Sequence, residues 1–128
     1  MVLIVEDHAD TAAALKRLLG KRGHTVAIAE TGEAAVARFD AAVAGGEPAP
    51  KVIILDMGLP RMDGVDVLRE LRARPELSRV PVIVYSADFG QERMRHAQEL
   101  GARQYLVKGA VSWATLLAAV ERHLPHAA

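Results

Sequence analysis

An aspartate at position 56 is the first residue whose surroundings suggest chemistry. It follows the aliphatic run VIIL at 52–55 and is followed by the proline- and glycine-containing turn GLPRMDG at 58–64. Four consecutive aliphatic residues are typical of a strand that is covered on both faces of a parallel sheet. In open α/β sheets, ligands bind just outside the carboxyl ends of the strands. Asp56 is therefore expected at the edge of the sheet where such proteins carry their chemistry.

Polar residues also follow other aliphatic runs of the chain. Glu6 and Asp7 follow the first run, Ser86 follows the fourth and Lys108 follows the fifth. Because the carboxyl ends of parallel strands open on one edge, we expect these side chains and that of Asp56 to meet in one crevice. Carboxylates that lie so near to one another would raise one another's pKa unless positive charge lies among them. Lys108 supplies one positive charge, and a divalent cation would supply the rest.

The residue types in this crevice indicate which cation and which reaction to expect. Carboxylate oxygens, in a chain with no cysteine, favour Mg²⁺, with Mn²⁺ as the alternative, over zinc. An ionised aspartate beside such a cation and a lysine can attack phosphorus and form an acyl phosphate. Asp56 is the predicted nucleophile.

The elements that position these residues alternate along the chain. Segments with apolar residues at helical spacing separate five short aliphatic runs, a pattern that indicates βαβ units and a parallel sheet. The predicted strands are VLIV at 2–5, TVAIA at 25–29, VIIL at 52–55, PVIVY at 81–85 and YLV at 105–107. Gly23 and Gly101 are expected to end helices, and Thr31 or Gly32 and Ser112 to begin them.

Length and composition limit the classes of function. The 128 residues are enough for one domain with its own core, so we expect a single domain over 1–128. Sixteen basic residues balance sixteen acidic ones, which argues against direct binding of nucleic acid or of a membrane surface. No apolar run is long enough for a membrane span, and there is no disulfide framework. These features predict a soluble, cytoplasmic protein.

The constellation of Asp56, Glu6, Asp7, Ser86 and Lys108 resembles that of the response-regulator receiver domain, the phosphoacceptor of two-component signalling. The resemblance extends over essentially all 128 residues. It implies a CheY-like, flavodoxin-like α/β fold. This is a doubly wound, five-stranded parallel sheet with five helices and strand order 2-1-3-4-5.

The resemblance also assigns roles to particular residues. It implies that Glu6, Asp7, Asp56 and the carbonyl of Gly58 hold Mg²⁺, that Asp56 is phosphorylated, and that Lys108 contacts the phosphoryl oxygens.

Further matches concern the switch and the turn. Ser86 matches the hydroxyl that moves to the phosphoryl group, and Tyr105 matches the aromatic residue that turns inward with it. Pro60 and Gly64 match the turn that follows the phosphoacceptor.

One position departs from the family pattern. Gly109 follows Lys108 where the family commonly has a proline, often in a cis peptide. Because a non-proline cis bond costs about 3 kcal/mol, we predict a trans bond there and a more mobile loop after the fifth strand. The departure bears on how well Lys108 is aimed.

Simpler roles remain open for several of these residues. Asp56 could cap a turn, and the acidic pair at 6–7 could begin the first helix. Ser86 could cap the fourth helix, with Asp88 as its rival, and Tyr105 could pack without switching.

The histidines, which lie at 8, 24, 96, 123 and 126, show no ligand spacing and are expected to be solvated. His8 alone borders the crevice, where it could tune the access of a phosphodonor. Phe89 and Met94, near the fourth helix, are expected to be exposed and to be available to a partner.

The resemblance implies partners rather than a metabolic substrate. A sensor histidine kinase or a phosphotransfer protein would supply the phosphoryl group. A downstream effector protein would then respond to the surface of the fourth helix, fifth strand and fifth helix, with a phosphorylation-dependent dimer as a further option. On this interpretation the chain is a signalling phosphoacceptor and not an enzyme.

Alternative functions leave different signatures. A degenerate receiver that only binds proteins would lack part of the crevice. A haloacid-dehalogenase-type phosphatase would need an aspartate at position 58, where this chain has glycine. A flavodoxin-like nucleotide binder would need a phosphate loop where this chain has EDHAD at 6–10. The Met1 start of the first strand favours a stand-alone or N-terminal domain, although a domain cut from a longer protein fits as well.

Overall fold

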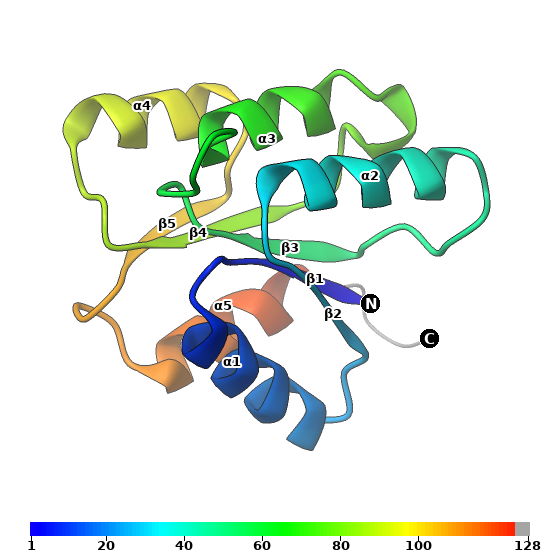
Figure 1. Cartoon of the computed structure of the whole chain (residues 1–128). Coiled ribbons are helices and arrows are strands. Elements are labelled where there is room, and N and C mark those ends of the chain that lie inside the picture. The colour runs from blue at the N-terminus through cyan, green and yellow to red at the C-terminus, as the bar shows by residue number, and fades with distance from the viewer. Residues whose placement is uncertain (125–128) are drawn as a thin grey trace.

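The computed structural model describes residues 1–124, which form a parallel five-stranded sheet covered by helices on both faces. The strand order is β2-β1-β3-β4-β5, so the predicted fold class and strand order are confirmed. The helices α2, α3 and α4 cover one face of the sheet, and α1 and α5 cover the other (Figure 1). The strands are β1 Val2–Val5, β2 Val26–Ala29, β3 Val52–Leu55, β4 Val82–Ser86 and β5 Gln104–Val107. The helices are α1 Ala9–Lys21, α2 Gly32–Val43, α3 Gly64–Arg72, α4 Gln91–Glu99 and α5 Trp113–His123, with a 3₁₀ turn at Pro75–Leu77.

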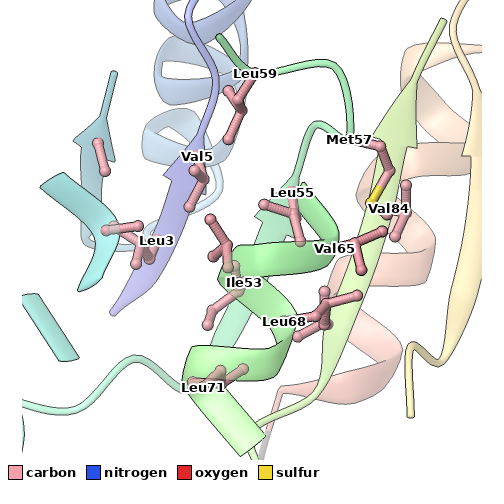
Figure 2. Close-up of a cluster of buried hydrophobic side chains, with 14 of the residues drawn as sticks. Leu3, Val5, Ile53, Leu55, Met57, Leu59, Val65, Leu68, Leu71 and Val84 are labelled. Carbon is pink, nitrogen blue, oxygen red and sulfur yellow. The ribbon is translucent and has the colours of Figure 1, made fainter. Parts of the chain in front are cut away.

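The core consists of two layers because alternate residues of each strand point to opposite faces. In β1, Leu3 and Val5 pack on the side of α2, α3 and α4, whereas Val2 and Ile4 pack on the side of α1 and α5. Figure 2 shows the first layer, in which side chains of β1 and β3 meet Val65, Leu68 and Leu71 of α3. The central strands β1 and β3 are buried along their whole length, as their uninterrupted aliphatic sequences predict.

The register of the central strands places their ends side by side. Val5 pairs with Leu55, and the backbone N–H of Asp56 donates to the carbonyl of Val5. The residues that follow β1 and β3 therefore leave the sheet at the same level. The turn after Asp56 requires glycine at position 64, since a Cβ there would lie 2.6 Å from the Cα of Met57.

The helices α2 and α5 begin at the capping residues that the sequence predicts, and the predicted glycines follow the ends of α1 and α4. The side chain of Thr31 accepts a hydrogen bond from the backbone of Ala34 at the start of α2, and Ser112 caps α5 in the same way. Gly23 and Gly101, which follow α1 and α4, have positive φ angles of 87° and 84°.

The element boundaries differ slightly from the prediction. The second strand begins at Val26 and the fifth begins at Gln104. The fourth strand is displaced by one residue, so that it begins at Val82 and ends at Ser86. The 3₁₀ turn was not predicted. The bond between Lys108 and Gly109 is trans, as predicted, and Gly109 has a φ of 84°. Among residues 1–124, no helix combines the length and apolar character needed to cross a membrane.

Candidate functional site

Asp56 lies at the centre of the crevice beyond the strand ends. Its side chain is almost fully buried, with 4% exposure of the residue. Its Oδ1 accepts hydrogen bonds from the backbone N–H of Gly58 at 3.0 Å and from the hydroxyl of Ser86 at 2.9 Å. Its Oδ2 lies 3.3 Å from the Nζ of Lys108. Three residues at the ends of different strands therefore contact this carboxylate: Gly58 after β3, Ser86 at the end of β4 and Lys108 after β5.

Glu6 is the second buried carboxylate of the crevice, with 2% exposure. Its Oε1 lies 2.6 Å from the Nζ of Lys108, so the lysine bridges Glu6 and Asp56. Its Oε2 accepts a hydrogen bond from the backbone N–H of His8 at 3.2 Å and lies 3.0 Å from His8 Nδ1. The lysine thus supplies the positive charge that the sequence predicts among the acidic groups.

The structure brings together a group of side chains that fits a metal ion. Glu6, Asp7, His8 and Asp56 each offer one ligand atom, and these atoms lie within 4.8 Å of one another. Three of the four are carboxylates, which suit a hard cation such as Mg²⁺ or Mn²⁺. The side chain of His8 is 66% exposed and lies at the rim, in contact with Glu6 and Asp7.

The two buried carboxylates have pKa values that are shifted in opposite directions. Burial raises the pKa of Glu6, and this effect exceeds the opposing contact with Lys108. Burial also acts to raise the pKa of Asp56, but the hydrogen bond from Gly58 and the contacts with Glu6, Ser86 and Lys108 hold that pKa below its usual value. Asp56 is therefore ionised at neutral pH.

The pKa of Lys108 follows from the same contacts. Burial acts to lower this pKa, but Glu6 and Asp56 together raise it above its ordinary value. The ammonium is charged, and its nitrogen also lies 5.8 Å from the centre of the Tyr85 ring. Trp113 packs against Tyr85, with 5.9 Å between the ring centres.

Ser86 and Tyr105 are joined through Asp88. The hydroxyl of Ser86 accepts a hydrogen bond from the backbone N–H of Asp88 at 3.2 Å, while it donates to Asp56. The hydroxyl of Tyr105 donates to the carbonyl of Asp88 at 2.5 Å. Ser86 does not cap α4, whose first residue follows Gly90 with no side-chain cap. The alternative capping role for Ser86 is therefore wrong.

The structure also adds residues that the sequence analysis missed. The ring of Tyr85 lies beside the ammonium of Lys108 and packs against Trp113, and Arg93 of α4 reaches back to the loop after Asp56. Tyr85 could have been found from the sequence, because it directly precedes Ser86. No local signal identifies Arg93, because its partners lie in other loops.

Two expectations about the surface need correction. His24 is not simply solvated, because its Nε2 lies 2.9 Å from Glu121, and the Nε2 of His123 is shielded from solvent. Met94 is only half-exposed because it lines a small hollow between α4 and β5, whereas Phe89 is 71% exposed, as predicted. His126 lies outside the described residues.

Comparison with known proteins agrees with the fold. A family model described as the response regulator receiver domain matches residues 2–121. The sensory transduction protein RegX3 of Mycobacterium tuberculosis is 41% identical over 107 residues, a match that covers 84% of this chain and 43% of RegX3. The chain thus spans less than half the length of that relative.

Solved structures give the same result. The chemotaxis protein CheY4 of Vibrio cholerae has a TM-score of 0.83 and 26% identity, with 96% of this chain and 97% of that chain covered. The Mn²⁺-bound form of the response regulator Rcp1 has a TM-score of 0.81 and 28% identity, with 98% of each chain covered. The chain belongs to the response regulator receiver domain family, whose members act in two-component signalling.

Proposed function

We propose that this chain is a phosphoacceptor and that Asp56 receives a phosphoryl group from the phosphohistidine of a sensor histidine kinase or a phosphotransfer protein. The observation that carries the proposal is the environment of Asp56: a buried carboxylate with a lowered pKa, 3.3 Å from a lysine ammonium and next to an acidic cluster. Such a carboxylate is ionised, and an ionised oxygen can attack phosphorus.

The chemistry of transfer needs little beyond positioning and charge. An oxygen of Asp56 forms a bond to phosphorus while the bond from phosphorus to the histidine nitrogen of the donor breaks. The electron pair of the broken bond returns to the donor imidazole. Lys108 neutralises charge on the phosphoryl oxygens, and the Ser86 hydroxyl, already 2.9 Å from Asp56, donates a hydrogen bond to one of them.

The proposal includes a divalent cation, with Mg²⁺ preferred and Mn²⁺ as the alternative. The side chains of Glu6, Asp7 and Asp56 and the carbonyl of Gly58 would hold it. Its support is the cluster of carboxylate oxygens, together with the presence of Mn²⁺ in the solved structure of Rcp1. When bound, the cation neutralises negative charge on the transferred group.

The output is proposed to be a change of surface rather than a reaction product. Ser86 and Tyr105 change their hydrogen bonds when Asp56 is phosphorylated, and the surface formed by α4, β5 and α5 changes with them. A cytoplasmic effector protein, or a second copy of the chain, then binds one state better than the other. Such a switch is a shift between two populations, and its size is limited by the difference in their affinities for the phosphoryl group.

Incubation with acetyl phosphate and Mg²⁺, followed by intact mass measurement, tests the proposal. The native chain is expected to gain the mass of one phosphoryl group, and the gain should vanish in Asp56→Asn and in excess chelator. A chain that gains no phosphoryl group and does not bind beryllofluoride would instead be a receiver that acts only by binding proteins.

A further inference from the structure

One arginine of α4 joins the two loops that flank Asp56 and Ser86. Arg93 Nη1 donates to the carbonyl of Met57 at 2.8 Å, in the loop between β3 and α3. Its Nη2 lies 3.2 Å from the carboxylate of Asp63, in the same loop. Its Nε lies 3.0 Å from the carboxylate of Asp88, in the loop between β4 and α4.

Two of the residues that Arg93 contacts, Met57 and Asp88, are directly linked to Asp56 and Ser86. Met57 directly follows Asp56, and its carbonyl precedes the N–H of Gly58 that donates to Asp56. The backbone N–H of Asp88 donates to the Ser86 hydroxyl, and the carbonyl of Asp88 accepts from Tyr105. A shift of Asp88 would therefore move the partners of both proposed switch residues.

We propose that Arg93 is a positioning residue that clamps the loop at 87–90 against the loop at 57–63 and so aims the Ser86 hydroxyl at Asp56 before any phosphoryl group arrives. The inference rests on the proposed function and adds a residue to it. In this arrangement the hydroxyl of Ser86 already donates to Asp56, and that of Tyr105 already donates to the carbonyl of Asp88, before phosphorylation. Phosphorylation then has less reorganisation to drive.

The chemistry of the arginine side chain explains why it suits this place. The guanidinium is planar and presents donors in three directions, so it can bond to the carbonyl of Met57 and to both carboxylates at once. Asp63 and Asp88 both lie next to this one cation. If the guanidinium is removed, the positive charge between the carboxylates of Asp63 and Asp88 is lost, and the two loops are expected to separate.

Two isolated surface ion pairs would carry little weight, because exposed pairs contribute little to stability. The side chain of Arg93 is only 34% exposed, however, and its third bond is to a backbone carbonyl beside Asp56. The combination of three partners in two loops gives the residue a geometric role that a single exposed pair lacks.

Beryllofluoride binding in the presence of Mg²⁺, measured by calorimetry, tests the inference through a double-mutant cycle. Arg93→Ala is expected to weaken binding about tenfold in the native background, which is within the usual range for residues of one hydrogen-bond network. Because Arg93 acts through Ser86, the same change in a Ser86→Ala background should weaken binding less than about twofold. Arg95→Ala is the matched control, since Arg95 lies on the same helix and pairs only weakly with Glu99 at 3.7 Å.

Two results would overturn the inference. One is native affinity in Arg93→Ala, and the other is an equal loss in both backgrounds, which would indicate a general structural effect. Arg93→Lys keeps the positive charge and serves as a second variant in case Arg93→Ala does not fold. It is expected to weaken binding several-fold only when Ser86 is present, and native binding by this variant would also count against the inference. Failure of the native chain itself to bind beryllofluoride would contradict the proposed function and not the role of Arg93 alone.

Discussion

Glu6 and Asp56 are both buried carboxylates, yet their pKa values move apart. At Asp56, the hydrogen bonds from Gly58 and Ser86 and the contacts with Glu6 and Lys108 together outweigh burial and favour the charged form. Glu6 also contacts Lys108 and His8, but burial and, with it, the neighbouring charge of Asp56 raise the pKa of Glu6. Burial dominates at Glu6 and favours its neutral form. The same crevice thus holds one carboxylate that is ionised at neutral pH and one whose charged form a nearby cation would stabilise.

Tyr85 is predicted to aim Lys108. Its ring centre lies 5.8 Å from the lysine nitrogen and 5.9 Å from the ring centre of Trp113, the first residue of α5. Tyr85→Leu should slow the phosphorylation of Asp56 by acetyl phosphate several-fold, because Lys108 loses a cation–π contact and a wall that limits its rotamers. The measurement is the initial rate of phosphorylation followed by intact mass.

Tyr85→Phe is the matched control, since it keeps the ring and removes only the hydroxyl. It should react at the native rate. Equal rates for the leucine and native chains would show that Glu6 and Asp56 alone hold Lys108 in place.

Much of the site could be predicted at the residue scale because strand ends of a parallel sheet converge. Asp56, Glu6, Ser86 and Lys108 were all placed together by this rule. Arg93 could not be found in the same way. It lies inside a helix, and its contacts depend on how two loops fold around it, which no periodicity in the sequence records.

At the scale of elements, each helix buries one stripe against the sheet. In α2 this stripe includes Ala35 and Phe39, which are fully buried. The two phenylalanines of the chain illustrate the contrast, since Phe39 is 0% exposed and Phe89, in the loop before α4, is 71% exposed.

Replacement of each phenylalanine by alanine should therefore have very different effects on stability. Phe39→Ala is expected to lower the free energy of unfolding by about 3–5 kcal/mol, because it leaves a cavity under α2. Phe89→Ala should change this free energy by less than about 0.5 kcal/mol. Urea denaturation followed by circular dichroism measures both, and similar losses in the two variants would contradict the burial of α2 described here.

The elements were predictable because their signals are local. Aliphatic runs gave the strands to within one residue, and Thr31 and Ser112 cap the helices that they were expected to begin. Pairings between distant elements were not predictable. Glu121 of α5 accepts from His24 and Arg22, which lie about a hundred positions earlier, and nothing in either segment alone indicates the contact.

For the whole molecule, the crevice concentrates negative charge that folding must tolerate. The raised pKa of Glu6 means that the folded chain holds this proton more tightly than the unfolded chain does. The stabilising contribution of this group is therefore full at pH values below its unfolded pKa and is lost as pH rises through the folded pKa. A bound cation would compensate for this loss at neutral pH.

Mg²⁺ is accordingly expected to raise the melting temperature of the chain at neutral pH. At a concentration one hundred times the dissociation constant, the added stability should be about 2.7 kcal/mol. The increase should shrink at mildly acidic pH, where protons compete for the carboxylates, and in Asp7→Asn, which removes one predicted ligand. Thermal denaturation with and without Mg²⁺ measures the effect. A melting temperature that does not change on addition of Mg²⁺ at neutral pH would contradict the proposed metal site.

The most direct test of the account is to locate the phosphoryl group on the chain. After reaction with acetyl phosphate and Mg²⁺, reduction with borohydride converts an aspartyl phosphate to homoserine, and peptide mass spectrometry identifies the position. We predict homoserine at position 56 and aspartate at every other aspartate position. Homoserine elsewhere, or a stable phosphoryl group on a histidine or serine with Asp56 intact, would contradict the claim that Asp56 is the phosphoacceptor.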